Sequence, residues 1–145
     1  MILEGRQSVL AAIEARQRSI QSVLIRRDSP PDRTADVVTA AETAGIPVRF
    51  VERQELEGLT HGTSHGGVAA VVSPKPRLSA DQLLERLAGV ANPLLLLLEG
   101  VDDARNLGFV LRSAEACGVS AVLIKKHLWD FDETEISRPS RGADE

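Results

Sequence analysis

Apolar residues recur along the first half of the chain at spacings that alternate between helix and strand. The positions of Val9, Leu10 and Ile13 predict a helix over residues 5–16, and the aliphatic stretch 22–26 predicts a short strand. The same reasoning predicts a helix over 32–44, a strand over 46–51, a helix over 52–59 and a buried strand over the run 68–72. This order of elements is typical of an α/β protein.

The second half of the chain predicts a linker followed by one β-α-β unit. Residues 74–77 contain two prolines and are expected to be extended, while residues 79–89 have the pattern of an amphipathic helix. The aliphatic run 94–98 predicts a fully buried strand, and a helix over 105–116 and a strand over 119–124 complete the unit. A strand, a helix and a strand in this order imply a parallel sheet.

These patterns divide the chain into three parts. We expect a first domain over residues 1–73, a linker with a helix over 74–92 and a second domain over 93–145. Hydrophobic residues make up 43% of the chain but aromatic residues only 3%. The cores are therefore expected to depend on Leu, Val, Ile and Ala.

The sequence favours a cytoplasmic protein. Its single cysteine, Cys117, excludes an intramolecular disulfide and is expected to be a small core residue. The first residues lack the basic and apolar regions of a signal peptide. The longest aliphatic run, residues 94–98, is far shorter than the roughly 20 residues of a membrane-spanning helix, so we expect no membrane partner.

Residues 98–114 are the strongest candidate for chemistry. They follow a predicted strand and open a helix, which places them at the carboxyl edge of a parallel sheet, where α/β proteins bind ligands. Asn106 and Arg112 differ by about 240° around an ideal helix, so they converge on one ligand only if Asn106 belongs to the loop before the first turn. Gly108 is then a structural loop residue that lets a backbone approach closely. The alternative is that Asn106 caps the helix and Arg112 is a surface residue.

The same residues resemble a motif of known enzymes. The series Asp-Asp-Ala-Arg-Asn-Leu-Gly at residues 102–108, followed by Arg-Ser-Ala at 112–114, is similar to the first motif of the SpoU/TrmH RNA 2'-O-ribose methyltransferases of the SPOUT superfamily. Three other segments resemble landmarks of that family in the expected order: residues 5–9, 65–70 and 140–143. Ala104 replaces a usual proline of the family, and Gly66 replaces a frequent glutamine.

The resemblance implies a fold, a reaction and partners. The fold is an N-terminal α/β/α RNA-binding domain followed by the first part of a parallel-sheet SPOUT domain, whose further motifs form a trefoil knot. The reaction is methyl transfer from S-adenosyl-L-methionine to a ribose 2'-hydroxyl of rRNA or tRNA, carried out by a homodimer. The knot motifs are expected beyond Glu145. No cofactor-binding residue is therefore assigned, and we expect the chain alone to be inactive.

The resemblance also implies that Asn106 and Arg112 are catalytic. A guanidinium has a pKa above about 12, so it is an improbable base at neutral pH. We expect Arg112 to contact the ribose or a phosphate and to favour the developing alkoxide, with Asn106 orienting Arg112 or the hydroxyl. Glu99 and Asp102 also lie near this edge, although acidic groups at such positions more often form caps and loop hydrogen bonds.

The charge distribution points to the N-terminal third for RNA binding. The net charge of −4 argues against a nucleic-acid partner, but residues 1–33 hold six arginines against four acidic residues. Arg6, Arg26 and Arg27 are the candidates for phosphate contact, with ordinary surface arginines as the open alternative. The sequence shows no aromatic platform for stacked bases in this domain.

Two other clusters are expected to have no role in chemistry. His61 and His65 are four residues apart, a spacing that chelates a metal on a helix, but Gly66 and Gly67 disfavour a helix there, so we expect no metal. The acidic run over residues 130–135 is expected to be a solvated loop.

Two other functions stay open. One is a non-catalytic RNA-binding fragment or relative without a methyl-donor pocket. The other is an unrelated α/β enzyme that binds a nucleotide phosphate at the turn over residues 100–108, although the chain has no G-x-G-x-x-G or P-loop pattern.

Overall fold

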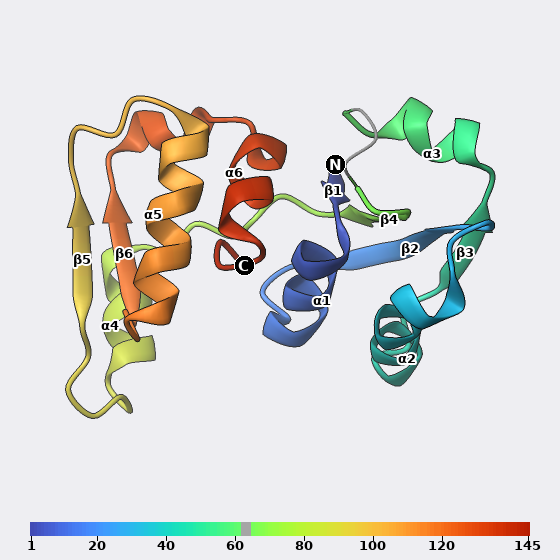
Figure 1. Cartoon of the computed structure of the whole chain (residues 1–145). Helices are drawn as coiled ribbons and strands as arrows, with labels where there is room; N and C mark the ends of the chain where they lie inside the picture. The colour runs from blue at the N-terminus through green and yellow to red at the C-terminus, as the bar shows by residue number, and fades with distance from the viewer. Residues whose placement is uncertain (62–64) are drawn as a thin grey trace. The chain divides into compact units, whose positions relative to one another are not determined.

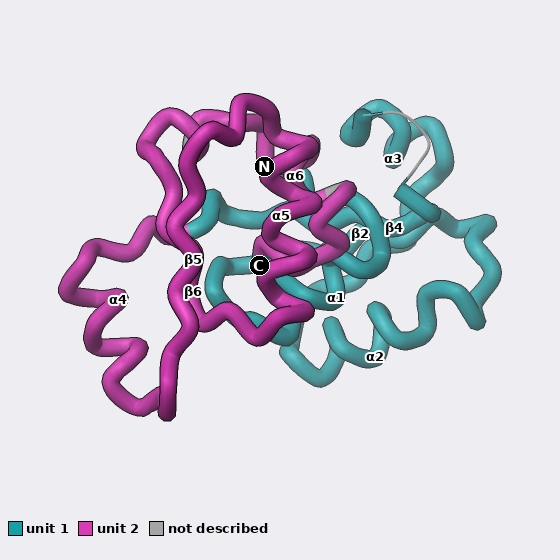
Figure 2. The backbone as a smooth tube through the Cα atoms, turned by 60° about the vertical axis from the view of Figure 1, so that its left-hand side comes forward, with its two compact units in different colours: residues 1–75, 145 teal, residues 76–144 magenta. Residues whose placement is uncertain are grey.

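The computed structural model describes residues 1–61 and 65–145, without the side chains of Trp129 and Arg138. The chain forms two compact units, shown in Figure 2. Unit 1 comprises residues 1–75 together with Glu145, and unit 2 comprises residues 76–144. Each unit has its own sheet and its own hydrophobic core.

Unit 1 is built on a four-stranded sheet with the order β1-β4-β2-β3. The strands are β1 (Ile2–Glu4), β2 (Ile20–Arg26), β3 (Val48–Val51) and β4 (Val68–Val72). Strand β4 pairs antiparallel with both β1 and β2, whereas β2 and β3 are parallel. The strand β1 adds an edge that the sequence patterns did not predict, because three residues are too few to show a periodicity.

Helices cover both faces of this sheet, as Figure 1 shows. On one face α1 (Arg6–Ala15) and α2 (Ala35–Thr43) pack against the sheet, and a single 3-10 turn (Pro31–Arg33) precedes α2. On the other face α3 (Arg53–Leu59) contributes Leu56, which is fully buried. The predicted α/β/α arrangement of the N-terminal part is therefore confirmed.

The alternation of side chains along β2 explains the three layers. Val23 and Ile25 belong to the core shared with α1 and α2, while Leu24 belongs to the core shared with α3. Successive residues of a strand point to opposite faces, so a strand covered on both faces is apolar at consecutive positions.

Unit 2 contains a two-stranded parallel sheet and three α-helices among its described residues. The strands β5 (Leu95–Leu98) and β6 (Ala121–Ile124) are joined by α5 (Ala104–Ala116), which gives the predicted β-α-β unit. The preceding α4 (Ala80–Leu87) begins with a capping box formed by Ser79 and Gln82. A 3-10 turn (Lys126–Asp130) and the helix α6 (Glu133–Ser140) follow β6, and α6 packs against α5.

The prediction of a fully buried strand over residues 94–98 is wrong. Leu98 and Leu96 belong to the core that contains α5, but Leu95 is 47% exposed and Leu97 is 73% exposed. These two side chains point to the opposite face of the sheet, and Leu123 of β6 is also exposed there. A run of leucines shows that a strand is apolar, but it does not supply the second layer that would bury both faces.

Two further expectations are corrected. The acidic run at 130–135 is not a solvated loop throughout, because α6 begins at Glu133 and the Asp132 carboxylate caps it by accepting the N–H of Thr134. Cys117 is exposed rather than part of the core, because it is the residue at which α5 ends. The helix expected over 79–89 is confirmed as α4, although none of its residues is buried and Leu84 is 67% exposed.

No helix in the described part of the chain combines the length and the hydropathy that crossing a membrane requires.

Candidate functional site

The carboxyl edge of the β5–β6 sheet collects polar residues from both strands. Leu98 pairs with Ile124 at the ends of the two strands, so the residues that follow them, Glu99 and Lys125, are neighbours. The ammonium Nζ of Lys125 lies 2.5 Å from Oε1 of Glu99. Both side chains are more than half exposed, so the ion pair contributes little to the stability of the fold. It does place one basic and one acidic group at this edge.

The start of α5 fixes the position of Asn106. Asp103 is the N-cap residue, and its Oδ1 accepts the backbone N–H of Asn106 at 2.7 Å. The side-chain amide of Asn106 donates to the other carboxylate oxygen of Asp103. Asn106 is therefore the third residue of the helix. Both expectations for it are wrong: it is not in the loop before the helix, and the cap is Asp103.

Arg112 lies six residues further along the same helix. On an ideal helix this separation is about 9 Å along the axis and about 240° around it. The Arg112 side chain is exposed, and among the described residues its guanidinium has no hydrogen-bond or ion-pair partner. Asn106 and Arg112 thus leave α5 in different directions, and their catalytic roles stay predictions.

Gly108 is a buried residue of α5 and not a loop residue, which corrects the structural role expected for it. A Cβ atom at this position would lie 2.4 Å from the carbonyl oxygen of Ile136 and 2.5 Å from Cγ of Pro139. A backbone does approach Gly108 closely, as expected, but it is the backbone of α6. The glycine allows these two helices to touch.

A partly buried carboxylate, which the sequence analysis did not predict, lies at the end of α6. The hydroxyl of Ser137 donates to Oδ2 of Asp144 at 2.9 Å, and the hydroxyl of Ser140 lies against the other oxygen. Both serines are almost fully buried. Ser140 opens the segment 140–143 that resembles a family landmark, so this landmark has a packing role at the end of α6.

The three arginines predicted to contact RNA all have acidic partners in unit 1. Nε of Arg6 donates to Asp36 at 3.0 Å in a two-point pair, and this hydrogen bond is the main cause that holds the pKa of Asp36 below its ordinary value. The Arg26 guanidinium lies against Asp28, and Nε of Arg27 lies 3.1 Å from Glu52. Contact of these arginines with phosphate stays a prediction. An RNA phosphate would have to replace the carboxylate that each guanidinium now contacts.

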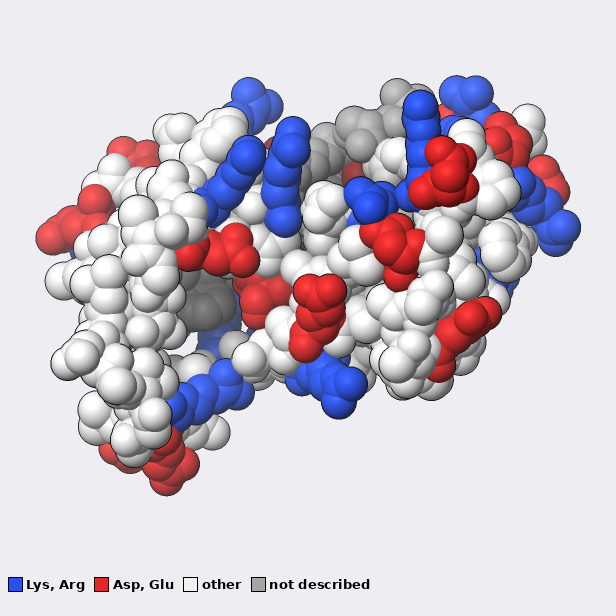
Figure 3. Space-filling model, turned by 60° about the horizontal axis from the view of Figure 1, so that its bottom comes forward, with Lys and Arg blue, Asp and Glu red and all other residues white. Residues whose placement is uncertain are grey.

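Charges of both signs are mixed on the surface. On the face drawn in Figure 3, lysine and arginine side chains alternate with aspartate and glutamate side chains. Such a surface gives less affinity for phosphates than a continuous basic patch, so specific contacts matter more for RNA binding.

The two histidines have separate roles. Oε1 of the buried Glu4 accepts the backbone N–H of His61 at 2.6 Å and lies 3.2 Å from its Nδ1. Nδ1 of the buried His65 accepts the N–H of Gly67 at 3.0 Å. The described residues contain no group of three His, Cys, Asp or Glu side chains placed to hold a metal ion.

Comparison with known proteins identifies the family. Residues 2–78, which cover unit 1 and the first residues of unit 2, match the family described as RNA 2'-O ribose methyltransferase substrate binding. The chain belongs to the SpoU family of RNA 2'-O-ribose methyltransferases. The resemblance to the SpoU/TrmH family is therefore confirmed, and an unrelated α/β enzyme is excluded.

Relatives match the SpoU chain beyond its N-terminal unit. It is 31% identical to the 23S rRNA (guanosine-2'-O-)-methyltransferase RlmB of Vibrio vulnificus over 97% of this chain and 57% of the relative. It is 34% identical to the same enzyme of Escherichia coli K12 over 86% of this chain and 51% of the relative. The chain spans about half the length of the curated relatives it matches.

The fold of the SpoU chain also matches a solved structure. The SpoU methyltransferase AviRb from Streptomyces viridochromogenes, in complex with AdoMet, superposes with a TM-score of 0.70 and 18% identity. The match covers 99% of this chain and 51% of AviRb. It confirms the predicted fold class, with a mixed α/β first unit and a parallel sheet in the second.

Proposed function

We propose that this chain supplies the RNA-binding domain and the first part of the catalytic domain of an rRNA ribose 2'-O-methyltransferase. The observation that carries the proposal is the 31% identity to RlmB over 97% of the chain, which extends through both units. The proposed substrate is 23S rRNA, with a guanosine ribose as the acceptor. The proposed compartment is the cytoplasm, where bacterial ribosomes are found.

The proposed methyl donor is S-adenosyl-L-methionine, because the AviRb structure holds this molecule. The donor would supply an activated methyl group on a sulfonium. The described residues of unit 2 do not fit the task of enclosing it, since the carboxyl edge is acidic and exposed at Glu99, Asp102 and Asp103 and since Leu97 is open to solvent. We assign no donor-binding residue in this chain.

Arg112 is the proposed electrostatic partner of the substrate. Its guanidinium is exposed and has no acidic partner among the described residues, in contrast to Arg6, Arg26 and Arg27. An unpaired guanidinium can bind a phosphate or a developing alkoxide at full strength, because no carboxylate competes for it. Asn106, whose amide is held by Asp103, is the proposed positioning residue of the same reaction.

A homodimer is the proposed assembly. Asn106 and Arg112 leave α5 in different directions, so one copy of residues 76–144 does not bring them to one ribose. A second copy that contributes one of the two side chains would complete the site. The open leucine face of the β5–β6 sheet is consistent with a unit that requires further polypeptide to cover it.

The experiment is to map ribose methylation in 23S rRNA. Cells that lack the gene region for residues 1–145 should lose 2'-O-methylation at one nucleotide, and restoring the natural gene should restore it. The same gene with Arg112→Ala should leave the nucleotide unmethylated. An unchanged methylation map after the deletion would remove the proposal.

A non-catalytic RNA-binding role is the second candidate. It is favoured by the separation of Asn106 and Arg112 within the described residues. Calorimetry with S-adenosyl-L-methionine shows whether residues 1–145 alone bind the methyl donor. We expect no heat of binding from residues 1–145, and micromolar binding would show that the donor site lies within them.

A further inference from the structure

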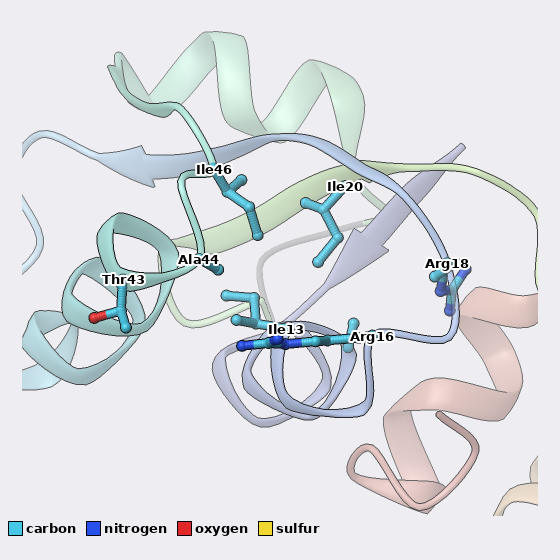
Figure 4. Close-up of a pocket in the computed structure, with 8 residues that line it drawn as sticks. Ile13, Arg16, Arg18, Ile20, Thr43, Ala44 and Ile46 are labelled. Atoms are coloured by element: carbon cyan, nitrogen blue, oxygen red, sulfur yellow. The ribbon is translucent and has the colours of Figure 1, made fainter.

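A groove in unit 1 is lined by residues that include neither Arg26 nor Arg27. It encloses about 370 Å³, at the lower end of the range for small-ligand sites, and it is formed by the end of α1, the start of β2 and the end of α2. Figure 4 shows the residues that line it. All of them belong to unit 1.

One wall of the groove is apolar. Ile13 of α1 is buried, and Ile20 and Ile46 are half-buried, and in Figure 4 these three side chains point toward a common space with Ala44 beside them. Isoleucine side chains carry no polar group, so this wall offers a ligand no hydrogen-bond partner. The wall therefore suits a flat apolar surface such as the face of a nucleobase.

The other wall carries a cation. The side chain of Arg16 lies along the groove in Figure 4, it is exposed, and within the described part of the chain no carboxylate or carbonyl pairs with its guanidinium. The second arginine of the groove, Arg18, is different, because it is buried and donates to the carbonyl of Ser73 at 3.2 Å. Arg16 is thus the cation that is available to a ligand.

The backbone at Arg16 supports a role for its side chain. Arg16 ends α1 in the left-handed conformation, with φ 51° and ψ 28°. Glycine adopts this conformation at a helix end without steric cost, so the protein is less stable with arginine at this position than it would be with glycine. Arg16 therefore destabilises the backbone, and its guanidinium has no partner among the described residues. A ligand that binds this guanidinium would explain why an arginine stands here.

We propose that this groove binds one unpaired nucleotide of the RNA substrate. The base lies against the isoleucine wall, and the guanidinium of Arg16 contacts the base face or the adjoining phosphate. Proteins that recognise RNA commonly stack unpaired bases on aromatic side chains or on arginine planes, because the base edges of an RNA duplex are poorly accessible. This inference rests on the proposed function, since it takes RNA as the partner, and it adds a second contact region to unit 1.

The experiment uses the 145-residue chain with labelled isoleucine methyl groups. Titration with single-stranded rU8 should shift the methyl signals of Ile13, Ile20 and Ile46, while the buried Ile136 of unit 2 serves as an internal control and should not shift. A self-complementary rCGCGCGCG duplex should leave the three groove signals unchanged. Equal shifts with the duplex would overturn the requirement for an unpaired nucleotide.

Variants of Arg16 separate binding from folding. Arg16→Gln should weaken rU8 binding about 10-fold and lower the salt dependence by about one phosphate contact, whereas Arg33→Gln, which removes an exposed arginine outside the groove, should change neither. Arg16→Gly should raise the Tm of unit 1 and still weaken binding. Arg141→Gly, which relieves the same backbone conformation at the end of α6, should not weaken binding.

The outcomes distinguish this inference from the proposed function. Binding of rU8 that shifts only signals outside the groove, or undiminished binding by Arg16→Gln, would overturn the groove as a nucleotide site. Neither result would contradict RNA binding elsewhere in the chain. Absence of any rU8 shift would also overturn it, while the 23S rRNA methylation map would still decide the proposed function independently.

Discussion

Gly108 of α5 lies directly against the carbonyl oxygen of Ile136 in α6, at a distance that leaves space for a hydrogen atom but not for a methyl group. This contact brings two helices of unit 2 together at a residue inside the motif that resembles the SpoU/TrmH family. The glycine of this motif therefore has a packing role in the described structure, separate from any role in binding a ligand.

Gly108→Ala should destabilise unit 2. Alanine favours a helix over glycine by up to about 1 kcal/mol, but the backbone of α6 must move to admit the Cβ, and overpacking of this kind costs about 1–3 kcal/mol. Hydrogen exchange of α5 and α6 amides measures the effect. The control is Gly58→Ala in α3, where a Cβ meets nothing within 4 Å, and it should stabilise unit 1. Slower exchange in Gly108→Ala would contradict the close packing.

Asp103→Ala should fray the start of α5. The variant removes the carboxylate that accepts both the backbone N–H and the side-chain amide of Asn106, and loss of an N-cap costs about 1 kcal/mol. Denaturant unfolding together with the amide signals of Asn106 measures this. Asp103→Asn keeps a capping oxygen and should retain most of the stability. Equal stability of the alanine variant and the natural protein would show that the cap is not needed.

Leu98→Ala should be far more costly than Leu97→Ala, although the two residues are adjacent in β5. Leu98 is in the core and its truncation is expected to cost about 2–5 kcal/mol, whereas Leu97 is 73% exposed and its truncation should change stability by less than about 0.5 kcal/mol. Denaturant midpoints of the two variants of the 145-residue chain measure the difference. Similar losses would mean that the Leu97 face is covered in solution.

The pair of Arg6 and Asp36 predicts a pH dependence. The hydrogen bond from Arg6 lowers the pKa of Asp36 below its ordinary value of 3.8, so the pair is fully present above that value and is lost as the pH falls through the lowered pKa. A ¹³C titration of the Asp36 carboxyl should show a midpoint below 3.8. Arg6→Gln should move the midpoint upward, and Arg33→Gln should not. An unchanged midpoint in Arg6→Gln would contradict the pairing.

Arg112→Lys should lower methylation activity by about 100-fold or more in a form of the protein that methylates RNA. A lysine keeps the positive charge but loses the planar fork that contacts two oxygens at once. Single-turnover methylation rates measure this, and Arg105→Lys, a change at an exposed arginine of the same helix, should be nearly neutral. A near-normal rate for Arg112→Lys would count against the need for a guanidinium.

Local patterns were sufficient for most elements and for the family. Val68–Val72 forms a strand with the predicted bounds, α1 differs from its predicted range by one residue at each end, and α5 differs by one residue at its start. The motif over residues 102–108 and 112–114 identified the family before any fold was known. These features depend on residue type and spacing within a short stretch, which the sequence displays directly.

Contacts between distant residues were beyond the reach of such patterns. The sequence left open whether Asn106 lies in the loop or caps the helix, because it could not show that the Asp103 carboxylate caps the helix three residues earlier. The sequence also led to the wrong prediction that the 94–98 strand is fully buried, because the apolar character of a strand does not reveal whether one or two layers cover it. It also left the helix α6 as a loop, since the stability of α6 comes from its packing on Gly108 and from the serine contacts with Asp144.

The amino-acid sequence by itself determined most of the helices and strands, because these follow from local spacing. Its motifs also resembled those of the SpoU family closely enough to indicate membership. Only the tertiary structure decided that Arg6, Arg26 and Arg27 have acidic partners while Arg16 and Arg112 have none among the described residues. The physical reason is that the availability of a charge depends on which side chains folding brings within a few ångströms of it, and those partners can lie far away in the chain.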